Sequence, residues 1–160
     1  MAREMQVEGM VEISQMLEKA GAQAASIAAQ GLYVGSGIVA DAVAQAIDNI
    51  QTAPFHFVKK GYRLPSPEEV DVIRGASGIS KFVKNGAEIS SWIGFQNSGY
   101  ADLNGKQVPI PLIANSISSG TSFMRKQPFV RKAVRQIKAR ASAEMAAKIE
   151  QCLKTITEEK

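Results

Sequence analysis

The chain has 160 residues, of which 45% are hydrophobic and 21% charged, and its formal net charge is +4. These values are ordinary for a globular protein, and the length predicts a single domain over residues 1–160 that needs no metal or disulfide to hold its core. The single cysteine, Cys152, excludes an internal disulfide framework, and the single histidine, His56, excludes multi-histidine metal sites and paired-histidine catalysis.

The N-terminal region is expected to start with a short polar segment and to continue as a helix. Residues 4–8 fit a short strand or an extended arm, and the absence of an apolar stretch there argues against a signal peptide. From Gly9 to Ala20 the apolar residues recur with helical spacing, which predicts a short helix. Gly21 is expected to break that helix.

A second, much longer helix is predicted from Ala22 to about Gln51. This stretch is rich in Ala, contains no proline and is largely apolar in its first half, so it should be buried against another element. Gly31, Gly35 and Gly37 weaken a helix and are expected to mark the close approach of another backbone. The 21 uncharged residues from Ala20 to Ala40 are long enough to span a bilayer, but their Gln, Ser and Gly content favours a buried helix.

The next segment contains a predicted loop and a third helix. Pro54 and Lys59-Lys60-Gly61 are typical of a loop. Ser66-Pro67-Glu68-Glu69 is a helix start, because Ser caps a helix, Pro suits its first position and acidic side chains favour its positive end. Gly75 and Gly78 are expected to end this helix.

A β-hairpin is predicted around Asn85-Gly86, which lies between two β-prone runs and favours a type I′ turn. A turn at that position pairs Phe82 with Ile89 and Ile79 with Trp92. One face of the hairpin is then apolar and should lie on the long helix; it is formed by Phe82, Ile89, Ile93 and Phe95.

The C-terminal half ends in another long helix. Residues 96–109, with Asn104-Gly105, predict a long loop or a small protruding hairpin, and residues 110–117 fit a strand or a short helix. Gly120-Thr121-Ser122 predicts a turn, and Pro128 opens a helix to about Thr157. The apolar line of that helix is expected to be buried; it consists of Val130, Val134, Ile137, Ala141, Met145, Ile149, Leu153 and Ile156.

These elements together predict an α+β fold. A small antiparallel sheet with the Asn-Gly hairpin packs on the long Ala-rich helix, and the C-terminal helix lies beside it.

One glycine motif is compatible with dinucleotide binding. Residues 35–40, from Gly35-Ser36-Gly37 to Ala40, match G-x-G-x-x-G/A, in which backbone N–H groups at a helix start hold a pyrophosphate. However, the acidic ribose-binding residue expected about 20 residues later is missing, and the chain has no repeated βαβ pattern. Helix-packing glycines are therefore favoured over a nucleotide-binding enzyme, and no cofactor is expected.

The other candidate catalytic residues have no supporting pattern. His56 stands between two phenylalanines without an orienting acid, and Cys152 falls near the apolar line of the last helix. Glu68 and Glu69 are explained by their helix start, and the Ser118-Ser119 pair has no triad context. No catalytic residue and no metal site is assigned.

The strongest feature of the composition is a basic segment before and within the last helix. Seven basic residues and no acidic residue lie between positions 125 and 140, while the rest of the chain has 12 basic and 15 acidic residues. Such a segment favours DNA phosphates or an acidic protein surface, and a solvated helix face is the third possibility. The candidate contact residues are Arg125, Lys126, Arg131, Lys132, Arg135, Lys138 and Arg140.

The order of the segments resembles a family of bacteriophage proteins. A short amphipathic start at 7–13 is followed by a long Ala-rich helix that ends at Ala53-Pro54 and by a hairpin that ends in Trp92-Ile93-Gly94-Phe95. Gly120-Thr121-Ser122 and then Gln127-Pro128-Phe129 precede the basic helix. Over roughly residues 6–155 this pattern is similar to the neck or tail-completion proteins, also called minor tail components, of long-tailed double-stranded DNA phages.

The resemblance implies a structural virion protein and no catalysis. Such a protein assembles in the host cytoplasm and forms an oligomeric ring at the head–tail junction, through which DNA passes. Its implied partners are further copies of itself, head-completion proteins and tail-tube or tail-terminator proteins, with possible non-specific contact to packaged DNA and none to a membrane. The alternatives are a small nucleotide-binding enzyme that uses Gly35-Ser36-Gly37 and a non-specific DNA-binding protein.

Overall fold

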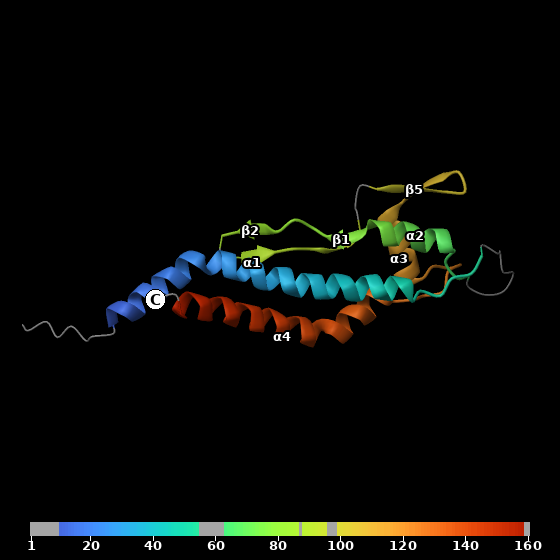
Figure 1. Ribbon diagram of the computed structural model, residues 1–160. Helices are drawn as coiled ribbons and strands as arrows, with labels where there is room; N and C mark the ends of the chain where they lie inside the picture. Colours follow the sequence, from blue (N-terminus) through green and yellow to red (C-terminus); the bar gives the residue numbers. More distant parts are fainter. Residues whose placement is uncertain (1–9, 55–62, 87, 96–98, 159–160) are drawn as a thin grey trace, which may run out of the picture.

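The computed structural model describes residues 10–54, 63–86, 88–95 and 99–158, and it has the α+β fold that the sequence predicts. Two long helices, α1 and α4, pack side by side, and strands lie along another edge of α1 (Figure 1). The elements in chain order are α1 (Met10–Asp48), α2 (Pro67–Ala76), β1 (Ser77–Ile79), β2 (Val83–Asn85), β3 (Glu88–Ser90), β4 (Ile93–Phe95), β5 (Tyr100–Leu103), β6 (Lys106–Pro109), α3 (Ile110–Ser119) and α4 (Phe129–Glu158).

The first helix, α1, is continuous over 39 residues, so the predicted break at Gly21 was wrong. A single glycine costs a helix roughly 1 kcal/mol relative to Ala, which neighbouring helix formers can offset. A Cβ at Gly21 would meet nothing within 4 Å. The arm or strand expected at 4–8 lies outside the described residues, as does the predicted loop at 59–61.

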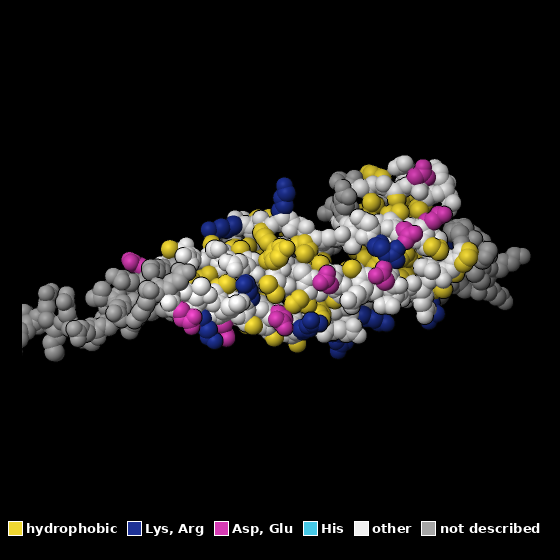
Figure 2. All heavy atoms as spheres, in the orientation of Figure 1, with side chains coloured by type: hydrophobic (Ala, Val, Ile, Leu, Met, Phe, Trp, Pro, Cys, Tyr) yellow, Lys and Arg dark blue, Asp and Glu magenta, His cyan; other side chains and the backbone are white. Residues whose placement is uncertain are grey.

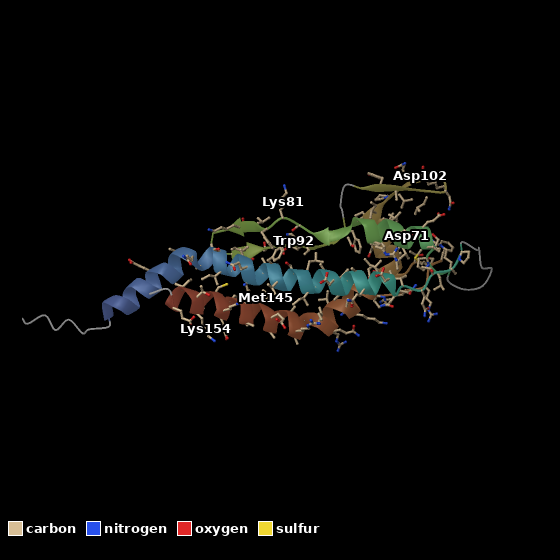
Figure 3. All side chains as sticks on the ribbon, in the orientation of Figure 1. Asp71, Lys81, Trp92, Asp102, Met145 and Lys154 are labelled. Carbon is tan, nitrogen blue, oxygen red and sulfur yellow. The ribbon has the colours of Figure 1, made fainter. Side chains whose placement is uncertain are left out.

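Close packing of α1 against α4 explains two of the three helix glycines. A Cβ at Gly31 would lie 2.8 Å from Cγ1 of Ile149, and one at Gly35 would overlap Cγ and Sδ of Met145. Figure 3 shows Met145 between the two helices. The expected approach of another backbone is confirmed at Gly31, where Met145 O would lie 3.4 Å from the Cβ. At Gly35 the close neighbour is the Met145 side chain and not a backbone, and at Gly37 the prediction was wrong, because a Cβ would meet nothing within 4 Å.

The last helix, α4, follows the predicted bounds, but its buried side differs from the predicted line. Val134 and Leu153 are 38% and 39% exposed, so these two members were placed wrongly. Phe129 and Ala133 are buried instead, together with the predicted Ala141. The residues of α4 on its buried side are therefore spaced four apart from Phe129 onward. Val134 does not fall in this series, so its side chain lies off the buried side.

The strands β1 to β4 form one long hairpin whose register differs from the predicted one. Asn85 pairs with Glu88, so Gly86, with a φ of +62°, follows the last paired residue instead of sharing the turn with Asn85. The predicted pairs of Phe82 with Ile89 and of Ile79 with Trp92 were wrong, because Ile89 faces Lys84 and Ile79 faces Ile93.

A local side-chain hydrogen bond accompanies this change of register. Between the paired ends, residues 80–82 oppose only residues 91–92, which makes a bulge. Ser80 N donates to Trp92 O at 2.7 Å, and Trp92 N donates to Ser80 Oγ at 2.8 Å. The hydroxyl thus replaces a backbone acceptor, a competition that residue pattern alone does not reveal.

The predicted placement of the hairpin on α1 is confirmed in part. Ile93 and Phe95 pack against the core, and the ring of Phe95 meets that of Phe129 edge to face at 6.1 Å. Ile89 is half-buried, whereas Phe82 is 40% exposed and touches Tyr33 of α1 with its ring at 6.3 Å.

The remaining elements follow the sequence with one correction. Helix α2 ends at Ala76 because Ser77 is extended, so the roles given to Gly75 and Gly78 were wrong. Residues 96–109 contain the protruding hairpin β5–β6, whose turn residues Asn104 and Gly105 have φ of 55° and 76°. The ambiguous segment 110–117 is helical, as part of α3.

The core lies at one end of the molecule, which we call the head. It forms where the end of α1 meets α2, α3, the β5–β6 hairpin and the start of α4, and its fully buried side chains are Ile47, Ile73, Ile117 and Pro65. The rest of α1 and α4 with the β2–β3 end of the long hairpin extends from the head (Figure 1); we call this part the arm.

One described segment, Gly21–Asp48, is long and apolar enough to cross a membrane by length and composition, with a mean hydropathy of 1.3. Core helices of water-soluble proteins meet the same criteria, and this segment packs against α4 and the hairpin. Its Ala and Gly content serves that packing.

Candidate partner-binding surface

The seven basic side chains of segment 125–140 are all exposed. Arg125 and Lys126 lie in the loop before α4, and the other five lie on its first turns. No described carboxylate pairs with any of them. Figure 2 shows dark blue side chains along the lower edge of the molecule, over the head half of α4. The charge is therefore available to a partner.

The loop before α4 is fixed by hydrogen bonds through the residues that carry the phage resemblance. Gln127 binds both backbone groups of Gln51: its Oε1 accepts from Gln51 N, and its Nε2 donates to Gln51 O, both at 2.9 Å. Gln127 N also donates to Ile117 O at 2.9 Å. One residue thus ties the end of α1, the end of α3 and the start of α4.

Thr121 and Gly120 shape the same loop. Thr121 Oγ1 accepts from the N–H groups of Phe123 and Met124 at 3.2 and 3.0 Å. Gly120 has a φ of +77°, and a Cβ there would lie 3.1 Å from the backbone nitrogen of Lys126. A larger residue would be strained and would press on the basic loop.

A buried ion pair anchors the other side of this loop. Arg63 N donates to Phe123 O at 2.6 Å, and Arg125 N donates to Arg63 O at 2.9 Å. The Arg63 guanidinium donates to both carboxylate oxygens of Glu69, at 2.7 and 2.8 Å. Burial raises the pKa of Glu69, but hydrogen bonds from Arg63 and Ser66 outweigh it and hold this pKa below its usual value.

A shallow cleft lies between the end of α1 and the start of α4, with a volume of about 550 Å³. Three cationic side chains line it, those of Arg125, Lys126 and Lys132. Its other polar lining is carboxamide and contains no carboxylate. The cleft is suited to an anionic group, either a phosphate or a carboxylate.

The glycine motif does not have the backbone geometry that binds a phosphate. Residues 35–40 lie in the middle of α1, with helix on both sides, so their N–H groups are engaged within the helix. Gly35 and Ser36 are buried, and Ser36 Oγ donates to Tyr33 O. A strand-to-helix turn is absent from this part of the described chain, so the fingerprint is explained by helix packing.

Accordingly, we expect no binding of NAD(P) or ATP. Titration calorimetry of the purified protein with each nucleotide should give only heats of dilution. A micromolar affinity for either nucleotide would contradict this expectation and would restore the enzyme alternative.

The other candidate catalytic residues remain isolated among the described residues. His56 lies outside the described part of the chain. Cys152 is half-buried, and its Sγ donates to Gln30 Oε1 at 3.3 Å. Within the described ranges, no group of three His, Cys, Asp or Glu side chains is placed to hold a metal ion.

Sequence reasoning missed two features of the surface. It did not identify the partner of Glu69, because Arg63 follows a segment without a clear pattern. It also expected Phe82 to lie on the face that packs on the long helix, whereas Phe82 is 40% exposed, and it did not identify Trp92 of the hairpin and Tyr33 of α1, 74% and 69% exposed, as exposed aromatic side chains. Tyr33, a large aromatic residue within an Ala-rich helix, was the sequence feature that could have indicated an exposed aromatic site.

Comparison with models of known protein families found no match, and neither the curated proteins nor the solved structures gave a similar chain.

Proposed function

We propose that the protein is a structural component of the head–tail junction of a long-tailed phage. In this role it forms a homo-oligomeric ring that completes the tail or joins it to the head, and DNA passes through the ring. One observation carries the proposal. The two motifs on which the phage resemblance rests, Gly120-Thr121-Ser122 and Gln127-Pro128-Phe129, form the hydrogen bonds that fix the loop before the exposed basic helix.

The exposed chemistry of the surface suits binding better than catalysis. No described carboxylate pairs with the seven basic side chains of segment 125–140, and the cleft beside them is open and shallow. Arg131, Arg135 and Lys138 are exposed on α4 with Val134 beside them, which suits an acidic protein surface. The proposed partners are further copies of the chain, head-completion proteins and tail-tube or tail-terminator proteins, within a virion assembled in the host cytoplasm.

Non-specific DNA binding is the second candidate, favoured by the same exposed positive charge. Three phosphate contacts would give an affinity for duplex DNA that falls with salt at a log–log slope of about −2.7. A ring through which DNA moves should bind it weakly, because tight phosphate contacts would hinder its passage. The two candidates therefore differ in DNA affinity at physiological salt.

The triple change Arg131→Ser, Arg135→Ser and Lys138→Ser separates the possibilities. We expect virions with this variant to fail in tail joining or to lose DNA, because three exposed charges of one face are removed together. The measurements are tail-joining and DNA-retention assays, with duplex-DNA binding followed across salt concentrations.

Lys148→Ser is the matched control, because this half-buried lysine lies on the arm half of α4, away from the basic segment. Normal assembly of the triple variant would leave the basic segment as a solvated face. Steeply salt-dependent DNA binding that the triple change abolishes would favour the second candidate.

A further inference from the structure

Two different edges of the molecule present complementary surfaces. One edge is the outward side of α4, and the other is formed by the long hairpin, α2 and the β5–β6 hairpin (Figure 1). We call them the helix edge and the hairpin edge. The hairpin edge runs from arm to head, and α4 runs along the arm to the near side of the head, beyond which α2 and the β5–β6 hairpin extend (Figure 1).

The arm part of the hairpin edge carries large exposed apolar side chains. Trp92 and Tyr33 are 74% and 69% exposed, and Phe82 rests against Tyr33. Ile79 and Val83 are also exposed in the same hairpin. Figure 2 shows the yellow side chains gathered over this region. A contiguous patch of this kind marks an interaction site.

Two lysines accompany this patch. Lys81 and Lys84 are exposed, and with the exposed carboxylate of Glu88 they leave this end of the hairpin with a net positive charge. Figure 3 shows Lys81 pointing away from α1 on the outer side of the hairpin. A partner for the patch should therefore offer carboxylates around a flat apolar surface.

The helix edge offers such a surface at the same level of the molecule. Gly31 and Gly35, which flank Tyr33 in α1, pack against Met145 and Ile149 of α4. The exposed residues of α4 around this level include four alanines, Ala139, Ala143, Ala146 and Ala147, with Arg140, Ser142 and Glu144 exposed between them. The exposed charges of the arm half of α4 are three carboxylates and one ammonium: Glu144, Glu150, Glu158 and Lys154.

At the head, each edge carries the charge opposite to the one that it carries in the arm. The hairpin edge there carries the exposed carboxylates of Glu68, Asp71 and Asp102. It also carries two exposed cations, Lys106 and Arg74, of which Arg74 is paired with Asp71 and Asp48. Figure 2 shows magenta side chains over this region, and Figure 3 labels Asp71 on α2 and Asp102 on β5. The helix edge at the head carries the basic side chains of α4.

We infer that the helix edge of one copy packs against the hairpin edge of the next, head beside head and arm beside arm. Aromatic side chains of the hairpin then meet the alanine face of α4, and Lys81 and Lys84 meet Glu144 and Glu150. At the head, the basic residues of α4 meet Glu68 and Asp102. This inference rests on the proposed ring and assigns its contact surfaces.

The order of charges determines the type of contact. Opposite signs meet at both ends when different edges face each other in the same orientation. They also meet when two identical edges pack antiparallel, but that arrangement does not place the aromatic side chains of the hairpin edge on the alanine face of α4. A two-fold contact between identical edges in that orientation would place like charges together, which is unfavourable. The contact between different edges satisfies the charges and also covers the exposed aromatic side chains, and it is heterologous. Heterologous contacts generate closed rings or open filaments.

Cross-linking tests this contact in the full-length chain. In a Cys152→Ser background, Val83→Cys on the hairpin edge and Ala143→Cys on the helix edge are combined in one chain. With a short bismaleimide, concentrated protein should give a ladder of covalent dimers, trimers and higher oligomers. Each single-cysteine variant should give almost no cross-linked product, because the edge of the neighbouring copy that its thiol faces carries no cysteine.

Charge reversal then tests the pairing itself. Lys81→Glu with Lys84→Glu should lower the yield of the ladder roughly tenfold, and Glu144→Lys with Glu150→Lys should do the same. All four changes in one chain should restore the ladder. Asp41→Lys on the open face of α1, outside both edges, should leave it unchanged.

Three results would overturn the inference. These are no ladder from the double-cysteine chain, dimers from either single-cysteine chain, and no rescue by the four-fold reversal. Failure of the proposed function is separate: a rescued ladder with virions that assemble without this protein would keep the contact and remove the protein from the head–tail junction.

Discussion

Replacing Glu69 by alanine is expected to lower the free energy of unfolding by roughly 2–4 kcal/mol. The Glu69 side chain is 11% exposed, and its carboxylate accepts hydrogen bonds from the Arg63 guanidinium and from Ser66 N. Its removal takes away the carboxylate partner of the Arg63 guanidinium. It also removes the half of the α2 capping box in which Glu69 accepts from Ser66 N. Chemical denaturation followed by circular dichroism measures the change.

Glu68→Ala is the matched control, because Glu68 stands one residue earlier on the same helix turn and is exposed. Its loss should change the free energy of unfolding by less than about 1 kcal/mol. Equal effects of the two substitutions would contradict the assignment of Glu69 as the anchor.

The same carboxylate makes stability depend on acid. The pKa of Glu69 is lowered in the folded protein, so the unfolded chain takes up the proton more readily. The stabilising contribution is therefore complete above the unfolded pKa of about 4.3 and is lost as pH falls through the folded value. Glu69→Gln should flatten the loss of stability below about pH 4 relative to the native protein.

The anchor also has a consequence for the surface. The hydrogen bonds of Arg63 join α2, which carries part of the acidic hairpin edge, to the loop that leads into the basic helix. Both charged ends of the inferred contact thus depend on one buried pair. Loss of Glu69 should weaken self-association as well as stability.

The sequence predicts most of the architecture because the strongest signals are local. Three signals need no tertiary information, and all three are confirmed: the helix start capped by Ser66, the turn at Asn104-Gly105 and the start of the last helix after Pro128. The continuity of α1 through Gly21 was missed, because the cost of one glycine has to be weighed against packing that no local pattern displays.

The surface was less predictable than the fold. The basic segment was identified from charge alone, and its exposure is confirmed. The exposed apolar patch was not identified, because the sequence alone does not distinguish an aromatic residue of the core from one that is exposed on the surface. The bulge beside Ser80 rotates the hairpin away from the expected register and leaves Trp92 exposed.

Gly35→Leu is the most direct test of the α1–α4 contact, and we expect it to destabilise the protein by about 1–3 kcal/mol. A Cβ at Gly35 already overlaps Met145, so a leucine has to displace that side chain or separate the helices. Gly37→Ala, two residues away with nothing within 4 Å of its Cβ, should instead stabilise by about 0.5–1 kcal/mol. Thermal and chemical unfolding measure both variants.

Adding Met145→Ala to Gly35→Leu distinguishes overpacking from a general loss of helix. If the two side chains compete for one space, the double variant should lose less stability than the sum of the single changes. The spacing of α1 and α4 also fixes how far the helix edge lies from the hairpin edge. A Gly35→Leu chain that melts higher than the native protein would show that this spacing is not set by the glycine.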